Sequence, residues 1–136
     1  MKSTAISALL SAVVLAGAGV AAAKPPLRDV SDIDDQVYYI LVAYVISEEC
    51  SVIDARKIKG VTRLWSLGRQ AQALGYSEAE IKAYIRSDEE KARMRKRGEA
   101  YMKVKGVSHD EPESFCELGH AEIERNSAIG VYLRAK

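Results

Sequence analysis

Cys116 and His120 have the residue types and spacing of metal ligands, because four positions along a helix bring two side chains to one face. Two ligands do not complete a metal site, and the chain has only one other histidine, His109. A c-type haem site needs two closely spaced cysteines followed by a histidine, and the sequence contains no such motif. We therefore predict no metal and no cofactor.

A second group with chemical potential is His109 and the acidic residues that follow it, Asp110, Glu111 and Glu113. An imidazole beside carboxylates can transfer protons, so this group is a candidate for acid–base chemistry. Acidic residues are also common where a helix begins, since they interact favourably with its dipole, and we favour this interpretation. The sequence contains no nucleophile-elbow serine and no glycine-rich phosphate loop. We therefore predict no catalytic residues.

The densest charge is a run of basic residues in the second half of the chain. On a helix these residues spread around much of the circumference, and Glu89–Arg93 and Arg95–Glu99 have the spacing of ion pairs. A solvated helix is the favoured interpretation, and contact with anionic lipid headgroups or an acidic partner is the alternative. The run comprises Lys91, Arg93, Arg95, Lys96 and Arg97.

The first 23 residues have the pattern of a cleavable signal peptide. Lys2 precedes an apolar run over residues 5–20, and three alanines at 21–23 supply the small residues that a signal peptidase requires. The run has about 16 residues, whereas a membrane-spanning helix needs roughly 20. We predict cleavage after Ala23, export to the periplasm, and a mature chain without a transmembrane segment.

The remaining residues, 24–136, have the size of one domain. The chain carries 20 basic and 19 acidic residues, so it lacks the basic excess of a nucleic-acid-binding protein. Its two cysteines are Cys50 and Cys116. An even count in a small exported domain indicates a disulfide, which would stabilise the fold by about 4 kcal/mol. The alternatives, a free thiol or a metal ligand, have no supporting residues nearby in the sequence.

The first helix should follow an extended arm at residues 24–30 and run from Asp32 to Glu49, with Ser31 as its N-cap. It is apolar nearly all round, which is typical of a helix at the centre of a bundle. Its β-branched and aromatic residues also suit a strand, but its length and cap favour a helix. One of its faces, which carries two tyrosines, is a candidate partner surface unless another helix or the C-terminal tail covers it. This face comprises Tyr38, Tyr39, Val42 and Ile46.

A second helix should follow the cap pattern at Ser51 and Asp54 and end near Leu74. Its expected core face comprises Ile58, Val61, Leu64, Trp65 and Ala71.

Serines at 77 and 87 each begin a capping-box pattern, so we predict two further helices with a break near Arg86. The second of these should end at Gly106. A fifth helix should begin at Pro112 and end near Asn126. The apolar residues 128–133 should pack back on the bundle.

Several short motifs in order give the chain a resemblance to a known family. Together they resemble the small exported proteins of alphaproteobacteria grouped as domain of unknown function 5333, over essentially the whole mature chain. The resemblance implies a mostly helical exported domain with paired cysteines, and it implies no activity. The motifs are residues 24–30, Asp54-Ala55-Arg56, Leu74-Gly75-Tyr76, Pro112-Glu113-Ser114-Phe115-Cys116, Leu118-Gly119, Ile129-Gly130-Val131 and Leu133-Arg134.

The sequence thus predicts an all-α fold, a compact bundle of about five helices with one disulfide. The leading functional hypothesis is a non-enzymatic periplasmic protein that binds another envelope protein or complex, because the first helix is apolar and no catalytic motif is present. A periplasmic holdase for unfolded clients is the first alternative, and an enzyme of unrecognised type is the second.

Overall fold

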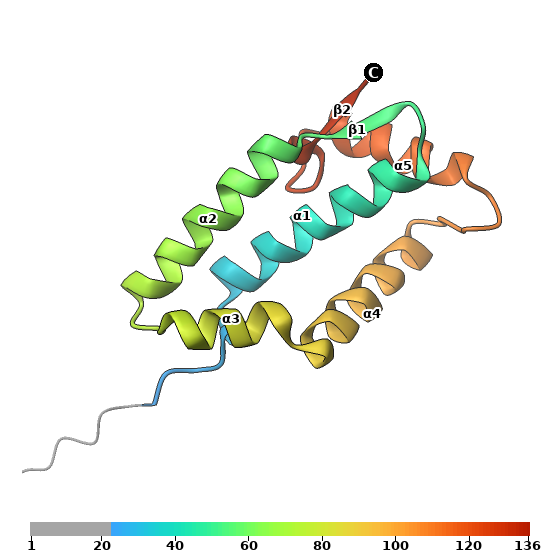
Figure 1. The fold of residues 1–136 in the computed structure, drawn as a ribbon. Helices are drawn as coiled ribbons and strands as arrows, with labels where there is room; N and C mark the ends of the chain where they lie inside the picture. Colours follow the sequence, from blue (N-terminus) through green and yellow to red (C-terminus); the bar gives the residue numbers. More distant parts are fainter. Residues whose placement is uncertain (1–22) are drawn as a thin grey trace, which may run out of the picture.

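The computed structural model describes residues 23–136, and residues 1–22, with nearly all of the predicted signal peptide, lie outside the described part. The described residues form a mostly helical fold in which α1 lies between the other helices (Figure 1). A small two-stranded sheet and two short 3-10 helices complete it. The elements are η1 (Leu27–Asp29), α1 (Ser31–Glu49), β1 (Ile53–Ala55), α2 (Lys57–Ala73), α3 (Glu78–Arg86), α4 (Asp88–Val104), α5 (Glu113–Glu124), η2 (Gly130–Tyr132) and β2 (Leu133–Ala135).

The start of α1 differs from the prediction in two respects. Residues 27–29 of the predicted extended arm form the turn η1, because Leu27 buries its side chain against Leu67 and Ala71 of α2. The N-cap position belongs to Val30, and Ser31 is already the first helical residue without a side-chain cap. The apolar packing of Leu27 therefore determines how the chain enters α1.

The predicted start of α2 is wrong, because the residues before it form a strand. β1 pairs antiparallel with β2, and the register places Ile53 opposite Ala135 and Ala55 opposite Leu133. Ile53 is buried in the core, and α2 begins only at Lys57. The apolar tail supplies the pairing partner from the far end of the chain. The predicted return of the tail to the bundle is thereby confirmed.

The capping pattern at Ser77 predicts the start of α3 correctly. The Ser77 hydroxyl accepts a hydrogen bond from the Glu80 amide, and the Glu80 carboxylate accepts one from the Ser77 amide. Ser87 ends α3 and caps α4 by accepting a hydrogen bond from the Glu90 amide, so the predicted break is confirmed. The Glu90 carboxylate pairs with Arg28 and Arg93, so the reciprocal bond of the predicted capping box is not formed. Gly106 has a positive φ of 74° just after α4, a conformation that glycine adopts without strain.

A disulfide joins Cys50 to Cys116 and confirms the predicted pairing, with 5.1 Å between the two Cα atoms. It connects the residue after α1 to the first turns of α5. Cys50 belongs to the main core, in which α1, α5 and the C-terminal tail also bury Ile46, Phe115 and Tyr132.

A polar cluster accompanies this core. Glu122 is buried and accepts hydrogen bonds from Tyr101 and Ser127, and it also pairs with Arg125. Burial would raise the pKa of Glu122, but the hydrogen bonds from Ser127 and Tyr101 and the charge of Arg125 outweigh it and lower the pKa. The carboxylate is therefore held ionised within the bundle.

Removing the disulfide should destabilise the fold strongly. We expect the Cys50→Ala/Cys116→Ala protein to lose about 4 kcal/mol of unfolding free energy, because the unfolded chain is no longer cross-linked. Guanidinium denaturation followed by circular dichroism measures this loss, with the oxidised protein as reference. A loss below about 1 kcal/mol would contradict the expectation.

Two glycines should respond oppositely to alanine. A Cβ at Gly130 would lie 1.9 Å from the Glu122 carbonyl oxygen, whereas a Cβ at Gly98 would meet nothing within 4 Å. We expect Gly130→Ala to lower the unfolding free energy by about 2 kcal/mol or more. Gly98→Ala should raise it by up to about 1 kcal/mol, because alanine favours the helix. Thermal denaturation of both variants compares them, and equal shifts would refute the packing argument.

Candidate binding groove

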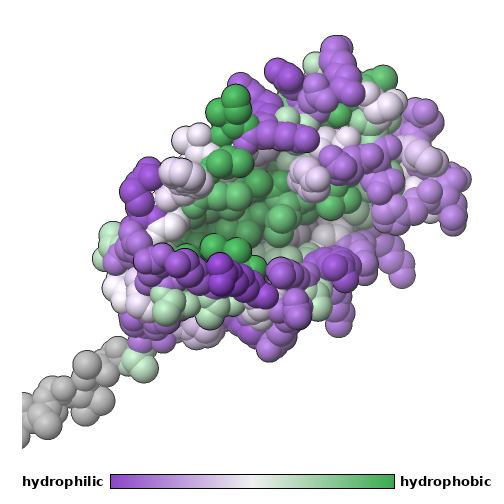
Figure 2. All heavy atoms as spheres, viewed as in Figure 1, coloured by the Kyte–Doolittle hydropathy of each residue, from purple (hydrophilic) through white to green (hydrophobic). Residues whose placement is uncertain are grey.

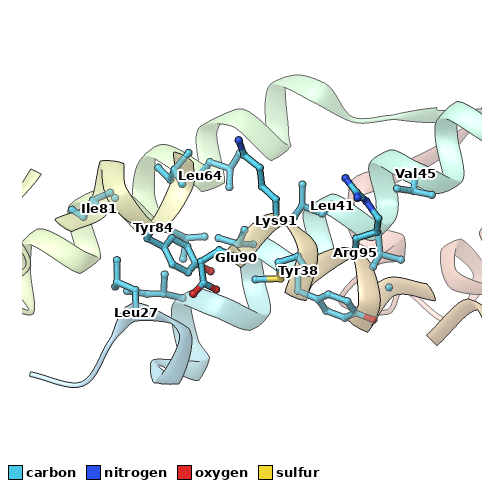
Figure 3. A pocket seen from close by; sticks show the side chains of 18 of the residues that line it. Leu27, Tyr38, Leu41, Val45, Leu64, Ile81, Tyr84, Glu90, Lys91 and Arg95 are labelled. Carbon is cyan, nitrogen blue, oxygen red and sulfur yellow. The ribbon is translucent and has the colours of Figure 1, made fainter. Parts of the chain in front are cut away.

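An apolar groove of about 500 Å³ runs along α1 on one side of the molecule. Its floor comes from α1, its walls from α2 and α4, and α3 contributes side chains at one end (Figures 1 and 3). Figure 2 shows the hollow as a continuous hydrophobic surface framed largely by hydrophilic residues. The volume lies within the range of small-ligand sites, which is about 300–1,000 Å³. The apolar side chains that line it include Ile33, Val37, Leu41, Val45, Leu64, Leu67, Ile81, Ile85, Met94 and Met102.

Two glycines keep the groove wide. Gly68 in α2 and Gly98 in α4 both line it, and a Cβ at either position would meet no atom within 4 Å. Neither residue has a positive φ, so the helical backbone does not require glycine there. Larger side chains at these two positions would extend into the open space. Gly60 differs, because a Cβ there would lie 3.4 Å from Ile40 of α1, where the two helices pack closely.

The wall formed by α2 continues into an exposed apolar stripe. Ile58 is 87% exposed and Trp65 is 70% exposed, and Val61 and Leu64 are also exposed. The predicted core face of α2 is therefore wrong except at Ala71, which is buried. The face of α2 that packs on the rest of the protein carries two small residues, Gly60 and Ala71, and one large residue, Leu67. Helical periodicity correctly groups the largest apolar side chains of α2 on one face, but that face is exposed to solvent.

The wall formed by α4 places charges of both signs at the groove, and Glu90 and Glu99 are the negative ones. Lys91 and Arg95 both line it, and in Figure 3 the Lys91 side chain extends toward Leu64 and that of Arg95 toward Leu41. Lys91 has an exposed ion pair with Asp88 at 3.6 Å. Arg95 has no ion pair with any residue in the range 23–136, and the predicted Arg95–Glu99 pair is not formed. These two cations are thus available to a bound molecule.

Two other members of the predicted basic surface point into the protein. Arg93 and Arg97 both pair with Asp34 of α1, whose side chain is nearly fully buried. Arg97 also donates to Asp35 at 2.7 Å, and its guanidinium lies 3.8 Å from the centre of the Tyr38 ring. The basic run is therefore divided, because a buried carboxylate on α1 attracts one side of α4. Lys96 is exposed on α4 outside the groove.

The ion pairs around Asp34 are linked to further contacts that hold α3 and the 3-10 turn η1. The Tyr84 hydroxyl donates to Asp34 at 2.6 Å, and burial together with this contact raises the pKa of Tyr84. Glu90 binds both Arg93 and Arg28, while Glu89 pairs with Arg28 at 2.9 Å instead of with Arg93 as predicted. Carboxylates from α1 and α4 thus connect three helices and η1 at the end of the groove where α3 contributes side chains.

The candidate partner surface on α1 is largely covered, which is the alternative that the sequence left open. Tyr38, Val42 and Ile46 are buried, and Tyr39 is half-buried. Ile46 belongs to the main core, because α5 and the C-terminal tail cover that part of α1. Tyr38 and Val42 do line the floor of the groove. The exposed large apolar residues of α1 are instead Leu41, Tyr44 and Val45.

The two histidines lie away from the groove. His109 is exposed, with Nδ1 3.7 Å from a Glu49 carboxylate oxygen and its ring 5.0 Å from that of Phe115. His120 is exposed on α5, and the neighbouring sulfur of Cys116 belongs to the disulfide. Within the described part of the chain, no three His, Cys, Asp or Glu side chains come together as metal ligands.

Residues 25–134 match the model of a protein family described as a family of unknown function, DUF5333. The chain belongs to the DUF5333 family. The resemblance seen in its motifs is confirmed, and the matched residues include every element that lines the groove. No curated protein matches the chain. No solved structure matches it either.

In this DUF5333 protein, removing the Asp34 carboxylate should loosen α4 from α1. We expect Asp34→Ala to lower the unfolding free energy by about 3–5 kcal/mol, because Arg93 and Arg97 lose a buried partner. Asp35→Ala is the matched control and should cost less than about 1 kcal/mol, because that residue is partly exposed. Urea denaturation of both variants measures the difference, and similar losses would contradict a special role of Asp34.

Proposed function

We propose that this DUF5333 protein is an exported, non-enzymatic binding protein that acts as an accessory to an envelope protein. Its groove would hold an apolar segment of that partner. The observation that supports this proposal is the groove itself, whose apolar floor is open to solvent between α2 and α4. Burial of apolar surface stabilises a complex by about 25 cal/mol for each Å² removed from water.

The exposed apolar residues beside the groove support a macromolecular partner. Leu41 lies on its α1 floor and Leu64 on its α2 wall, and Val61 and Trp65 continue the exposed surface along α2. Large contiguous apolar patches are uncommon on monomeric proteins and often mark interaction sites. A ligand confined to the groove would leave the Trp65 side of α2 in water.

Export to the periplasm is part of the same proposal. It rests on the signal-peptide pattern of residues 1–23 and on the Cys50–Cys116 disulfide, which suits an oxidising compartment. Among the helices of residues 23–136, none is sufficiently long and apolar to cross a membrane.

A holdase for unfolded clients is the second candidate. The specific observation in its favour is the exposed stripe of Ile58, Val61 and Trp65, which extends beyond the groove. Holdases bind many sequences through such surfaces, whereas an accessory protein binds one partner. The number of partners bound through the groove therefore separates the two functions.

Photo-cross-linking tests the proposal directly. We expect benzoylphenylalanine in place of Leu41 to cross-link one envelope protein in cells of the source organism, because Leu41 is exposed and lines the groove. Gly98→Leu should abolish the product by filling the groove, and Ala100→Leu should not, because Ala100 is an exposed residue of α4 that does not line the groove. Gel electrophoresis and mass spectrometry identify the product.

The outcomes of this experiment are distinct. A single product that depends on an open groove supports the accessory function, and a broad set of groove-dependent products supports the holdase. No product, or a product insensitive to Gly98→Leu in a variant with native circular dichroism, refutes the groove as the binding site. Gly68→Leu blocks the groove from α2 and serves as an independent repeat.

A further inference from the structure

The groove has the dimensions of a site for one additional helix. α1 forms its floor, and α2 and α4 stand on either side of it. From Ile33 to Val45 the floor extends over about 18 Å, at about 1.5 Å for each helical residue. About three turns of another helix have this length. A helix placed there would pack against three others, as in a four-helix bundle.

The walls allow a helix to approach closely. Packed helices are separated by about 8–10 Å, and small residues at the contact permit the shorter distances. Gly68 on α2 and Gly98 on α4 present bare backbone to the groove. The flexible side chains of Met94 and Met102 also line it and can adapt to an apolar partner surface.

The two rims differ in charge, which gives the occupant an orientation. On the α2 side, Leu64 continues into the exposed Val61 and Trp65, so this rim is apolar. On the α4 side, Lys91 and Arg95 lie one helical turn apart and provide the charge described above. Glu90 also lines the groove, but its carboxylate is paired with Arg28 and Arg93. Glu99 follows one turn after Arg95 and is negative, so the positive charge of this rim is confined to Lys91 and Arg95. A helix that matches this pattern has an apolar face with a negatively charged flank on one side.

We propose that the groove binds an amphipathic helix of a partner protein that carries two acidic side chains one turn apart along its α4-facing flank. Lys91 and Arg95 bind these carboxylates, and the apolar face of the helix packs on α1 and α2. This inference rests on the proposed binding function and adds the chemistry of the partner. An alkyl chain would fill the groove but would leave the apolar α2 rim exposed, so a helix accounts for more of the surface.

Two synthetic peptides test this inference with the purified full chain. Both are amphipathic helices of about 16 residues with one leucine stripe, and they differ only in a flank that carries either two glutamates or two lysines. Labelled peptides are titrated by fluorescence anisotropy at low and high salt. We expect the glutamate peptide to bind roughly tenfold more tightly at low salt, because opposite charges complement each other across the rim.

Charge reversal on the protein should invert this preference. In Lys91→Glu/Arg95→Glu the lysine peptide should bind more tightly than the glutamate peptide. Lys96→Glu/Lys103→Glu is the matched control, since it makes the same change in net charge at exposed residues of α4 outside the groove. This control should retain the original order. Emission from Trp65, the only tryptophan of the chain, should shift to shorter wavelength when a helix covers the α2 rim.

The results separate this inference from the proposed function. Equal affinity for both peptides, or a preference that Lys91→Glu/Arg95→Glu leaves unchanged, overturns the acidic helix. Failure of both peptides to bind, together with a groove-dependent cross-link in cells, refutes a helical occupant while the binding function stands. Dodecanoate that binds without the Trp65 shift and displaces the peptides indicates a lipid occupant instead. Concentration-dependent dimers that Gly98→Leu abolishes indicate a second copy of the chain.

Discussion

The buried carboxylate of Asp34 is the interaction on which the open groove depends. It accepts hydrogen bonds from Tyr84 of α3 and from Arg93 of α4, and Arg97 pairs with it as well. Apolar contacts also join the two helices, because Met94 and Met102 of α4 share the main core with Tyr38 and Val42 of α1. Asp34, Arg93 and Arg97 do not line the groove, so their ion pairs hold α4 against α1 without filling the hollow.

The opposite end of the molecule is stabilised by covalent and apolar contacts. There the disulfide, the β1–β2 pair and the apolar contacts of Phe115 and Ile46 form a dense core. Gly119 and Gly130 show how dense it is, because a Cβ at either would collide with neighbouring atoms. The protein thus combines a densely packed core at one end with an open groove at the other. This arrangement keeps the apolar surface of the groove accessible, because the helices that line it do not close over it.

Local signals in the sequence predicted much of this architecture. The serines at 77 and 87 located two helix starts because capping depends only on residues three positions apart. The Cys50–Cys116 pairing followed from a count of two, and it is confirmed. The strand at Ile53–Ala55 was missed because its partner lies at the other end of the chain. The groove was missed because its signal, two glycines facing an unfilled space, has no distinctive spacing.

The sequence by itself determined the helices, the cross-link and the family, because these follow from near neighbours, residue counts and ordered motifs. Only the tertiary structure decided which apolar faces are covered. Helical periodicity identifies a face but not its neighbour. The stripe of Ile58 and Trp65, predicted to lie in the core, is therefore exposed, while Ile46, on a candidate partner surface that the tail could cover, is buried. Tertiary contacts also decided the roles of the basic residues of α4. Arg93 and Arg97 pair with the buried Asp34, whereas Lys91 and Arg95 line the groove.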